Sequence, residues 1–455
     1  MVKERIVIIG ADAAGMSAAG RIRKLLPDSD ITAYERSSHS SYAACGIPYY
    51  VAGLVDAESR LIARTPEQFL EGQNILVRTR CEVISVDPGA SSLLVRDLES
   101  GREFGDHYDK LLFATGAVPA IPPVEGADAE GIFSLSTLDS GIAARRFADE
   151  ERPQRITVIG GGYIGLEMAE AFSCVRGLKV TLLDKSPQVM NTFDPDMAEF
   201  MAHAIRDVGT ELRLGEGLVA FGVKDGRVRT VITERGEIET DMVIMGLGVR
   251  PNTALARDAG LELSVRDSIR ADQAMATSHP QIWAAGDCAS TAHLITGKPF
   301  WVALGTVANR MGRVAGISMG GGKASFSGVL GTAMSKHCDF EVARTGLSEK
   351  EAVEHGYDYV STLIKTRTRA GYYPGAEVMH VKLVAEAETG KLLGGQIVGG
   401  QGSAKRVDIL ATALTAGMTL KELIDLDLGY APPFSLVWDP VQIAGRSLLG
   451  KMDME

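Results

Sequence analysis

The chain has 455 residues, 45% of them hydrophobic and 23% charged, so we expect two to four domains, each with its own core. The formal net charge of −11 argues against a general affinity for nucleic acid or an anionic membrane. No apolar run approaches the ~18 residues of a membrane span, and the N-terminus enters a strand-like run without a signal peptide. The five cysteines are dispersed and form no C-x-x-C pair. We therefore expect a cytoplasmic protein with reduced thiols, no disulfide framework and no zinc site.

A dinucleotide-binding βαβ unit begins at the N-terminus. A β-branched run, Arg5–Ile9, precedes the loop Gly10-Ala-Asp-Ala-Ala-Gly15 and a helix-like segment, and a second run, Asp30–Tyr34, ends at Glu35. In such a unit the glycines permit a tight turn, the helix N-terminus receives the pyrophosphate, and the acid binds a ribose hydroxyl. Asp12 departs from the pattern, because a glycine usually stands there and lets the backbone approach the pyrophosphate.

A second unit of the same kind follows about 150 residues later. The strand Arg155–Ile159 leads into Gly160-Gly-Gly-Tyr-Ile-Gly165, and the strand Lys179–Leu183 ends at Asp184. Two such units predict that one chain carries two dinucleotides. Asp184 favours a free 2′-hydroxyl and hence NADH, whereas Lys185 leaves NADPH open because a cation accepts a 2′-phosphate.

The stretch from Ser41 to Tyr50, S-Y-A-A-C-G-I-P-Y-Y, contains Cys45 with no partner cysteine nearby. Pro48 is typical of the first turn of a helix, which places the thiol at a helix start, where an anion is favoured. A thiol there falls from a pKa of ~8.5 toward neutrality or below and becomes reactive. The alternative is a buried cysteine in a glycine-containing turn.

Two further strand-like runs make the pattern specific. Tyr108–Gly116 ends in A-T-G, and the run from Ile282 carries A-x-G-D at Ala284–Asp287. With these motifs the chain resembles the FAD-dependent pyridine nucleotide–disulfide oxidoreductases over essentially its whole length. The resemblance implies that the first unit binds FAD, that the second binds NADH or NADPH, and that Asp287 holds the ribityl chain of FAD.

The resemblance also implies an α/β fold with two Rossmann-like dinucleotide-binding domains and a C-terminal α+β dimerisation domain. Residues 1–117 and 245–325 would form the FAD domain, with the NAD(P) domain, 118–244, inserted between them. Residues 326–455, where strand-like runs precede a helix-like segment, would dimerise the chain. We therefore expect a homodimer.

The cofactor-binding residues that the resemblance implies lie in or beside these motifs. Tyr163 would cover the flavin until the nicotinamide displaces it. The full set is Gly10, Asp12, Ala13, Gly15, Glu35, Arg36, Ser41, Thr115, Gly116, Asp287, Ala303, Thr306, Gly160, Gly162, Tyr163, Ile164, Gly165, Asp184, Lys185 and Gly248.

Within the family, Cys45 matches the single-cysteine branch of coenzyme A–disulfide reductases and NADH oxidases and peroxidases. Tyr50 stands where another branch has a second cysteine, so an internal redox disulfide at Cys45 is not expected. Tyr372 and Tyr373, with Tyr430, resemble the tyrosines that coenzyme A–disulfide reductases bring from one subunit to the cysteine of the other. They could equally be ordinary interface aromatics.

The first hypothesis is therefore an NAD(P)H-dependent reductase of coenzyme A disulfide, or of coenzyme A persulfide or polysulfide, that works through a Cys45–CoA mixed disulfide. The alternatives are an NADH oxidase or peroxidase that cycles Cys45 through sulfenic acid, and a redox-responsive FAD- and NADH-binding protein. The other four cysteines are interpreted as packing residues, and the histidines show no metal-ligand spacing. Basic residues that resemble the contacts to the coenzyme A phosphates are Arg21, Arg23, Lys24 and Arg64, at least one of which we expect to be an ordinary exposed residue.

Overall fold

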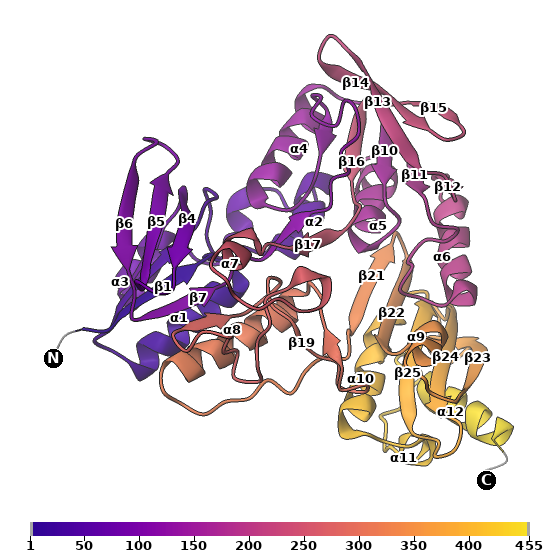
Figure 1. Ribbon diagram of the computed structural model, residues 1–455. Coiled ribbons are helices and arrows are strands. Elements are labelled where there is room, and N and C mark those ends of the chain that lie inside the picture. Colours follow the sequence, from indigo (N-terminus) through magenta and orange to yellow (C-terminus); the bar gives the residue numbers. More distant parts are fainter. Residues whose placement is uncertain (1–2, 453–455) are drawn as a thin grey trace.

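The computed structural model describes residues 3–452 (Figure 1). Its first layer is a five-stranded parallel sheet in the order β18-β7-β1-β2-β3. The first two predicted strands are confirmed, and the buried β-branched side chains of β1 are typical of a parallel sheet covered on both faces. The strands are β1 (Arg5–Ile9), β2 (Asp30–Tyr34), β3 (Ile75–Arg78), β7 (Lys110–Phe113) and β18 (Ile282–Ala284).

Two helices from distant parts of the sequence pack closely beside this sheet, α1 (Ala13–Leu25) and α8 (Gly305–Met319). Glycines on α8 allow the approach. A Cβ on Gly312 would lie 2.2 Å from the carbonyl oxygen of Ala14, and one on Gly316 would lie 2.5 Å from that of Ala18. The first glycine loop is thereby held between β1 and a tightly packed helix pair.

The second parallel sheet has the order β12-β11-β10-β16-β9. Its helix α5 starts directly after the second glycine loop and ends in a π-helical turn, η3. The elements are β9 (Ile132–Phe133), α4 (Leu138–Glu150), β10 (Arg155–Ile159), α5 (Tyr163–Glu170), η3 (Ala171–Val175), β11 (Lys179–Asp184), α6 (Pro195–Asp207), β12 (Glu211–Leu214) and β16 (Met242–Met245).

Two three-stranded antiparallel sheets, which the sequence patterns did not predict, extend from these layers (Figure 1). A short antiparallel pair, β8 (Ala117–Pro119) and β17 (Val249–Pro251), links the chain segments that enter and leave the second sheet. The strands of the two small sheets are β4 (Cys81–Asp87), β5 (Ser92–Asp97), β6 (Glu103–His107), β13 (Leu218–Lys224), β14 (Arg227–Thr233) and β15 (Gly236–Glu239).

The C-terminal region is the predicted α+β structure, built on an antiparallel sheet in the order β21-β22-β25-β24-β23. The strand-like runs predicted there are strands, and β21 is an additional one; the predicted runs are Phe340–Thr345, Tyr359–Thr366, His380–Ala385 and Gly394–Val398. The elements are β21 (Ala333–His337), β22 (Phe340–Gly346), α9 (Glu349–Glu354), β23 (Tyr359–Arg367), β24 (Val378–Glu386), β25 (Leu392–Gly399), α10 (Val407–Ala416), α11 (Leu420–Ile424) and α12 (Pro440–Lys451).

The remaining elements are short and lie in the connections. Among them, α2 follows Cys45 and packs against α4, α5 and η3, so it joins the cysteine segment to the second nucleotide-binding layer. The elements are η1 (Ala44–Gly46), α2 (Ile47–Ala52), η2 (Glu58–Arg60), α3 (Pro66–Gln73), α7 (Ala254–Asp258), η4 (Val265–Asp267), β19 (Thr291–Ala292), β20 (Pro299–Phe300) and η5 (Ala404–Arg406).

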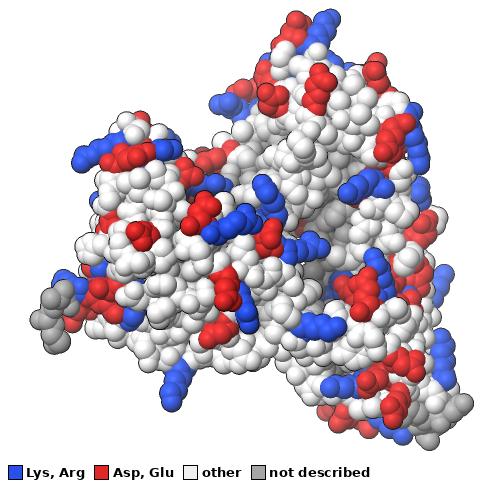
Figure 2. All heavy atoms as spheres, viewed as in Figure 1, with Lys and Arg blue, Asp and Glu red and all other residues white. Residues whose placement is uncertain are grey.

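The surface carries charges of both signs. Figure 2 shows basic and acidic side chains interspersed over one face rather than gathered by sign. Within residues 3–452, no helix is both long and apolar enough to cross a membrane.

Candidate active site

The two glycine loops occupy equivalent places, each at the carboxyl end of the central strand of its parallel sheet. A Cβ on Gly15 would lie 1.9 Å from the carbonyl oxygen of Gly10, and one on Gly165 would lie 1.7 Å from that of Gly160. Gly10 and Gly160 have φ values of +103° and +110°, a region that side chains disfavour. Both loops therefore require glycine where the motif places it.

The two predicted ribose-binding acids lie beside their loops. Glu35 accepts a 3.0 Å hydrogen bond from the Ala11 N–H. Asp184 accepts bonds of 2.7 Å from the Gly161 N–H and 2.8 Å from the Ser186 N–H. Lys185 is exposed. This is the arrangement expected of two dinucleotide-binding units.

Asp287 has the features of a group that awaits a polar ligand. Burial raises the pKa of its carboxyl to about 6, against a hydrogen bond from the Leu304 backbone that lowers it. Its Oδ1 is buried and has no hydrogen-bond partner within the described chain. A buried, orphaned acceptor is costly unless a ligand satisfies it, so Asp287 fits the hydroxyl-rich ribityl chain that the sequence motif implied.

The other predicted FAD residues lie near the first glycine loop, the A-T-G turn and the start of α8. The Thr115 hydroxyl donates to the Asn252 carbonyl at 2.6 Å, and Gly116 has a φ of +67° with open space where a Cβ would stand. Ala303 and Thr306 flank the start of α8. The other predicted positions, Ala13 at the first turn of α1, Arg36 after β2 and Ser41 with its N–H bonded to the Ala11 carbonyl, lie around the first loop.

Asp12 ties the first glycine loop to the cysteine segment. Its carboxylate accepts a 3.1 Å hydrogen bond from the Tyr42 N–H. Burial, opposed by that bond, raises the pKa of Asp12 to about 6, and the negative charges of Glu35 and Asp287 act in the same direction. Asp12 thus has a structural contact that explains why an acid replaces the usual glycine.

Cys45 lies in the short turn η1, immediately before α2, as predicted. It is exposed and unpaired. The predicted low pKa is wrong for the protein chain alone: partial desolvation raises the pKa of Cys45, and the negative charges of Glu167, Asp287 and Asp12 add to the effect. Desolvation, the largest cause, together with the three carboxylates outweighs the backbone hydrogen bond that lowers the pKa of Cys45.

Glu167 is a site residue that the sequence patterns missed. Burial raises the pKa of its carboxyl to about 7, close to neutrality, and the Ser335 hydroxyl donates to it at 3.3 Å. It lies four residues after Tyr163 on α5, which places both side chains on one face of the helix. That spacing was the available signal.

The predicted nicotinamide-side residues line the start of α5. The Tyr163 hydroxyl is buried without a partner among the described residues. A Cβ on Gly162 or on Gly248 would meet open space, and Ile164 is half-buried. This part of the loop is open enough for a nucleotide to approach the backbone.

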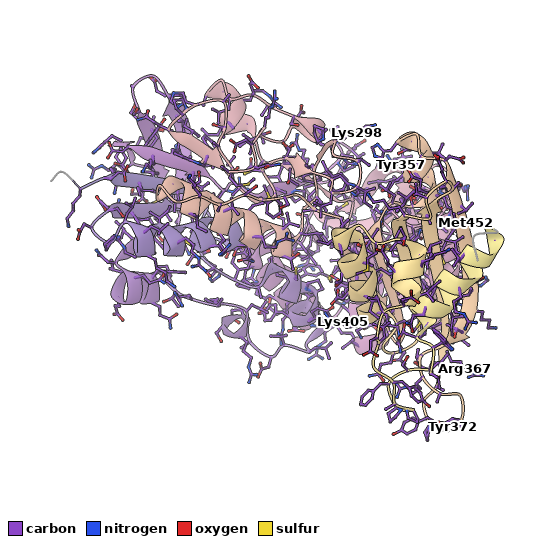
Figure 3. The ribbon with its side chains drawn as sticks, turned by 90° about the horizontal axis from the view of Figure 1, so that it is seen from below. Lys298, Tyr357, Arg367, Tyr372, Lys405 and Met452 are labelled. Carbon is purple, nitrogen blue, oxygen red and sulfur yellow. A yellow bond between two sulfur atoms is a disulfide. The ribbon has the colours of Figure 1, made fainter. Side chains whose placement is uncertain are left out.

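The predicted tyrosines gather far from the glycine loops. The hydroxyls of Tyr372 and Tyr430 lie 3.5 Å apart, and the Ala370 N–H bonds the Pro432 carbonyl, which joins the two segments. Tyr373 is also exposed. Figure 3 shows Tyr372 at the outer tip of the C-terminal region, pointing away from the rest of the chain. The structure therefore brings the two tyrosine motifs together but leaves them facing solvent.

The basic residues predicted to contact the coenzyme A phosphates differ in how exposed their side chains are. Arg23 donates to four backbone carbonyls, those of Pro27, Ser29, Gln73 and Asn74, and so is a structural residue rather than an exposed one. Lys24 and Arg64 are exposed, the latter with its guanidinium 5.0 Å from the centre of the Phe69 ring. Arg21 is half-buried.

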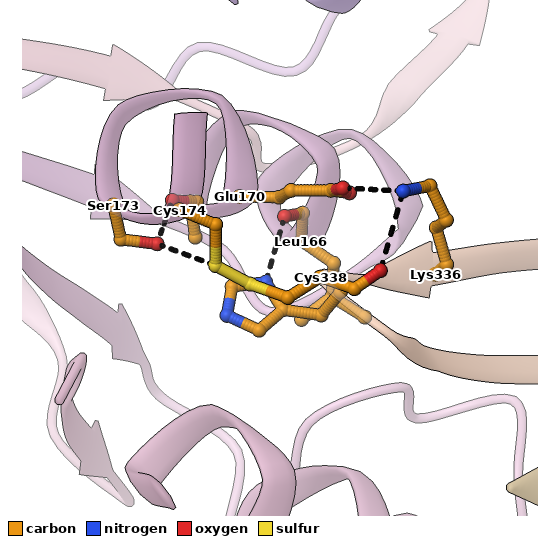
Figure 4. The surroundings of a disulfide bond; sticks show 8 residues. Leu166, Glu170, Ser173, Cys174, Lys336 and Cys338 are labelled. Atoms are coloured by element: carbon orange, nitrogen blue, oxygen red, sulfur yellow. Dashed lines mark hydrogen bonds and ion pairs between the residues drawn. A yellow bond between two sulfur atoms is a disulfide. The ribbon is translucent and has the colours of Figure 1, made fainter. Parts of the chain in front are cut away.

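One expectation about sulfur chemistry is wrong. Cys174 and Cys338, interpreted as packing residues with reduced thiols, form a disulfide across 164 residues of sequence (Figure 4). His337, beside Cys338, shares a potential metal-binding group with both sulfurs. These residues are distant in sequence and meet only through tertiary packing, so spacing along the chain gave no signal. Cys81 and Cys288 are buried and unpaired, as packing residues would be.

The chain matches a family model described as pyridine nucleotide–disulphide oxidoreductase over residues 4–312, and the dimerisation domain of the same family over residues 332–440. It is 40% identical over 449 residues to an NAD(P)H sulfur oxidoreductase (CoA-dependent) from Pyrococcus furiosus, with 98% of this chain and 100% of the other covered. An NADH oxidase from Methanocaldococcus jannaschii is 37% identical, with 98% and 99% covered. The structure of reduced CoADR-RHD from Bacillus anthracis matches with a TM-score of 0.95 and 34% identity, over 100% of this chain and 81% of that one.

Two dinucleotide-binding sheets, a lone cysteine between them and a C-terminal antiparallel sheet define a class of two-nucleotide oxidoreductases. The matches extend over nearly all of the chain. The chain belongs to the pyridine nucleotide–disulphide oxidoreductase family.

Proposed function

We propose that this protein is an NAD(P)H-dependent flavoprotein that reduces coenzyme A disulfide, coenzyme A persulfide or polysulfide. The observation that carries the proposal is the lone, exposed Cys45, held at the start of α2 between two dinucleotide-binding loops with no second cysteine beside it. A relative named as a CoA-dependent sulfur oxidoreductase, matched over its full length, supports the same substrate class.

The residues of the first unit would hold FAD, with Asp287 on its ribityl hydroxyls, and those of the second would hold NADH or NADPH, with Asp184 on the ribose. Bound there, FAD supplies the transfer of two electrons from the nicotinamide to sulfur. Tyr163 would cover the flavin until the nicotinamide displaces it. The orphaned Oδ1 of Asp287 is the structural feature that favours this assignment.

Cys45 performs thiol–disulfide exchange. Its thiolate attacks one sulfur of the substrate disulfide, forms a Cys45–S–S–CoA mixed disulfide and releases the other half as a thiolate. Two electrons and a proton then return Cys45 to the thiolate and release the second thiol. Glu167, whose carboxyl has a pKa of about 7, is placed to hold a proton near this sulfur.

The remaining roles are part of the same proposal. Arg21, Lys24 and Arg64 would meet the coenzyme A phosphates, and Tyr372 or Tyr373, with Tyr430, would hydrogen-bond the departing thiolate across a homodimer interface. The division into residues 1–117 and 245–325, 118–244 and 326–455 describes the FAD, NAD(P) and dimerisation domains. A cytoplasmic location suits an enzyme that needs a reduced Cys45 thiol.

Steady-state turnover of coenzyme A disulfide by the FAD-loaded enzyme tests the proposal. Cys45→Ser should abolish NAD(P)H-dependent thiol release, whereas the buried control Cys81→Ser should retain it. If oxygen or peroxide is consumed faster than any sulfur acceptor, the enzyme is instead an oxidase or peroxidase, as one relative's name indicates. Anaerobic bleaching of the flavin by NADH, with no acceptor turned over, would instead indicate a redox-responsive binding protein.

A further inference from the structure

Away from the glycine loops, two sulfurs and an imidazole converge between the second nucleotide-binding layer and the C-terminal sheet. Cys174 lies in η3, and His337 and Cys338 lie where β21 turns into β22. The sulfurs are bonded to each other (Figure 4), and one ring nitrogen of His337 lies within 4.8 Å of both. The disulfide therefore has a nitrogen ligand beside it.

His337 is 1% exposed, and one of its two ring nitrogens makes no hydrogen bond to the described residues. Its Nδ1 lies 3.3 Å from the Leu166 carbonyl, while its Nε2 is buried without a partner among the described residues. A buried nitrogen without a partner is costly. When Nδ1–H donates to a backbone carbonyl, Nε2 carries the lone pair, which is the usual arrangement of a metal-bound histidine.

We propose that Cys174, Cys338 and His337 form a redox-switched metal site, which binds a soft divalent cation such as Zn²⁺ when the sulfurs are reduced and is closed by the disulfide when they are oxidised. Two thiolates and an imidazole are ligands that select zinc among the common divalent cations. Because Cys174 is exposed, water supplies the fourth position.

The switch closes and opens by thiol–disulfide exchange. The Cys174 thiolate attacks a low-molecular-weight disulfide, forms a mixed disulfide and releases one thiolate. The Cys338 thiolate then attacks the Cys174 sulfur, closes the protein disulfide and releases the second thiolate together with the metal ion. Two molecules of a low-molecular-weight thiol reopen the bond by the reverse exchange, which supplies two electrons and two protons and forms the small disulfide again, and metal binding then displaces the two thiol protons.

The turn that carries two of the ligands is held independently of the disulfide. Lys336 bonds Glu170 at 2.7 Å and the Cys338 carbonyl at 3.2 Å (Figure 4). Cys338 itself has a φ of +54°. Because these contacts do not involve the sulfurs, we expect them to hold His337 and Cys338 in place when the disulfide opens.

The same elements touch the candidate active site. Arg176, two residues after Cys174, donates to the Val51 carbonyl of α2 at 2.9 Å. Ser335, two residues before His337, donates to Glu167. The proposed site is thus connected by one contact to the helix behind Cys45 and by another to the carboxylate near its sulfur, although the metal site does not depend on the proposed activity.

Metal binding to the FAD-loaded enzyme tests the proposal. The protein is reduced with a phosphine, desalted without oxygen, and titrated with Co²⁺, and with Zn²⁺ in competition with a chromophoric chelator. We expect one metal ion per chain, with thiolate-to-cobalt charge-transfer absorption. Cys174→Ser, at an exposed position, should remove that absorption, and Cys45→Ser should preserve it.

His337→Gln should weaken the affinity by more than the roughly 10–100-fold that loss of an outer-shell partner costs. Oxidation with coenzyme A disulfide should release the bound zinc, and phosphine should restore binding. Absence of charge-transfer absorption in the reduced protein, or an absorption unchanged by Cys174→Ser, would overturn the metal site. Zinc retained after complete oxidation of both sulfurs would overturn the switch.

Discussion

Three carboxylates around Cys45 oppose the thiolate that the proposed exchange needs. Glu167 is the largest charge contribution among them to the raised pKa of the thiol. Two of the three, Asp12 and Asp287, belong to the predicted FAD site, and Glu167 is held by Ser335 of β21. The reactivity of the sulfur therefore depends on groups from distant parts of the fold. Glu167 is therefore the acid to substitute in a test of how the carboxylates affect the pKa of Cys45.

Glu167→Gln should lower the pKa of Cys45, because it removes a negative charge that disfavours the thiolate. The pH profile of Cys45 alkylation by iodoacetamide should shift to lower pH, and alkylation below that pKa should become faster. Glu199→Gln, at an exposed position on α6 whose charge acts on neither Cys45 nor Glu167, is the control and should leave the profile unchanged. Identical profiles for Glu167→Gln and the native enzyme would exclude this electrostatic role.

Asp287→Asn should stabilise the cofactor-free chain at alkaline pH while weakening FAD retention. The folded carboxyl has a pKa of about 6, raised by burial from 3.8, so the folded state binds its proton more tightly than the unfolded state does. The free energy of unfolding therefore falls as the pH rises from about 4 to 6, by up to about 3 kcal/mol for this group.

Urea unfolding of the cofactor-free protein at pH 5 and pH 8 measures the effect. The native chain should lose more stability between these pH values than Asp287→Asn, while Asp425→Asn, an exposed control, should behave as the native chain. Equal pH dependence in all three proteins would contradict the assigned pKa. Unchanged FAD retention in Asp287→Asn would separately contradict its cofactor role.

Sequence motifs identify single residues well when the structure around those residues is formed by neighbouring positions in the sequence. Gly10, Asp184 and Asp287 each stand at the end of a strand in a short motif, and the structure places each at the carboxyl end of that strand. Glu167 and the Cys174–Cys338 pair are different, because their partners come from β21 and the turn after it. No local pattern specifies a contact across 164 residues.

At the scale of elements, the tight turn into α5 depends on one glycine. Gly165→Ala should lower the stability of the fold by about 1–3 kcal/mol, since its Cβ would overlap the Gly160 carbonyl. Gly162→Ala is the matched control, because its Cβ would meet only open space within the chain. Both variants should raise KM for NAD(P)H, but only Gly165→Ala should lower the thermal midpoint. Equal midpoints would show that the turn can relax.

The parallel strands were predictable because their runs are apolar and bounded by glycine. Since both faces of these strands are buried, few polar residues interrupt the apolar runs. The antiparallel sheet β4–β6 was not. Its strand Glu103–His107 alternates exposed and half-buried positions and contains three ionisable residues, so little apolar periodicity remains. Strands that cover one side of a domain need less hydrophobicity, and their sequences are correspondingly less distinctive.

At the scale of the whole molecule, the C-terminal region exposes an aromatic and aliphatic surface, which we define as Tyr372, Phe434, Val437 and Trp438. Their exposed fractions are 78%, 76%, 71% and 45%. Exposed apolar groups of this size usually mark an interface. The dimerisation family model covers residues 332–440, so the surface is well placed to meet a second copy of the chain in a symmetric interface.

The tyrosines extend this argument to catalysis. Tyr372 and Tyr430 lie together at a tip that points away from their own chain (Figure 3), so they can serve a cysteine only if it belongs to the partner. We expect Cys45→Ser and Tyr430→Phe homodimers to be inactive, or nearly so, and activity to return when the two subunits are refolded together. Each heterodimer would contain one site with both an intact Cys45 and an intact Tyr430.

Tandem purification with two different tags isolates the heterodimer, and its coenzyme A disulfide turnover should approach half that of the native dimer, since one of two sites is complete. A heterodimer of Cys45→Ser with Tyr357→Phe is the control. Tyr357 lies in the C-terminal region but bonds the Ile295 carbonyl of its own chain, so the Tyr357→Phe homodimer should be active and its heterodimer with Cys45→Ser should keep one complete site. Verified Cys45→Ser/Tyr430→Phe heterodimers without activity would show that the site is not shared between subunits.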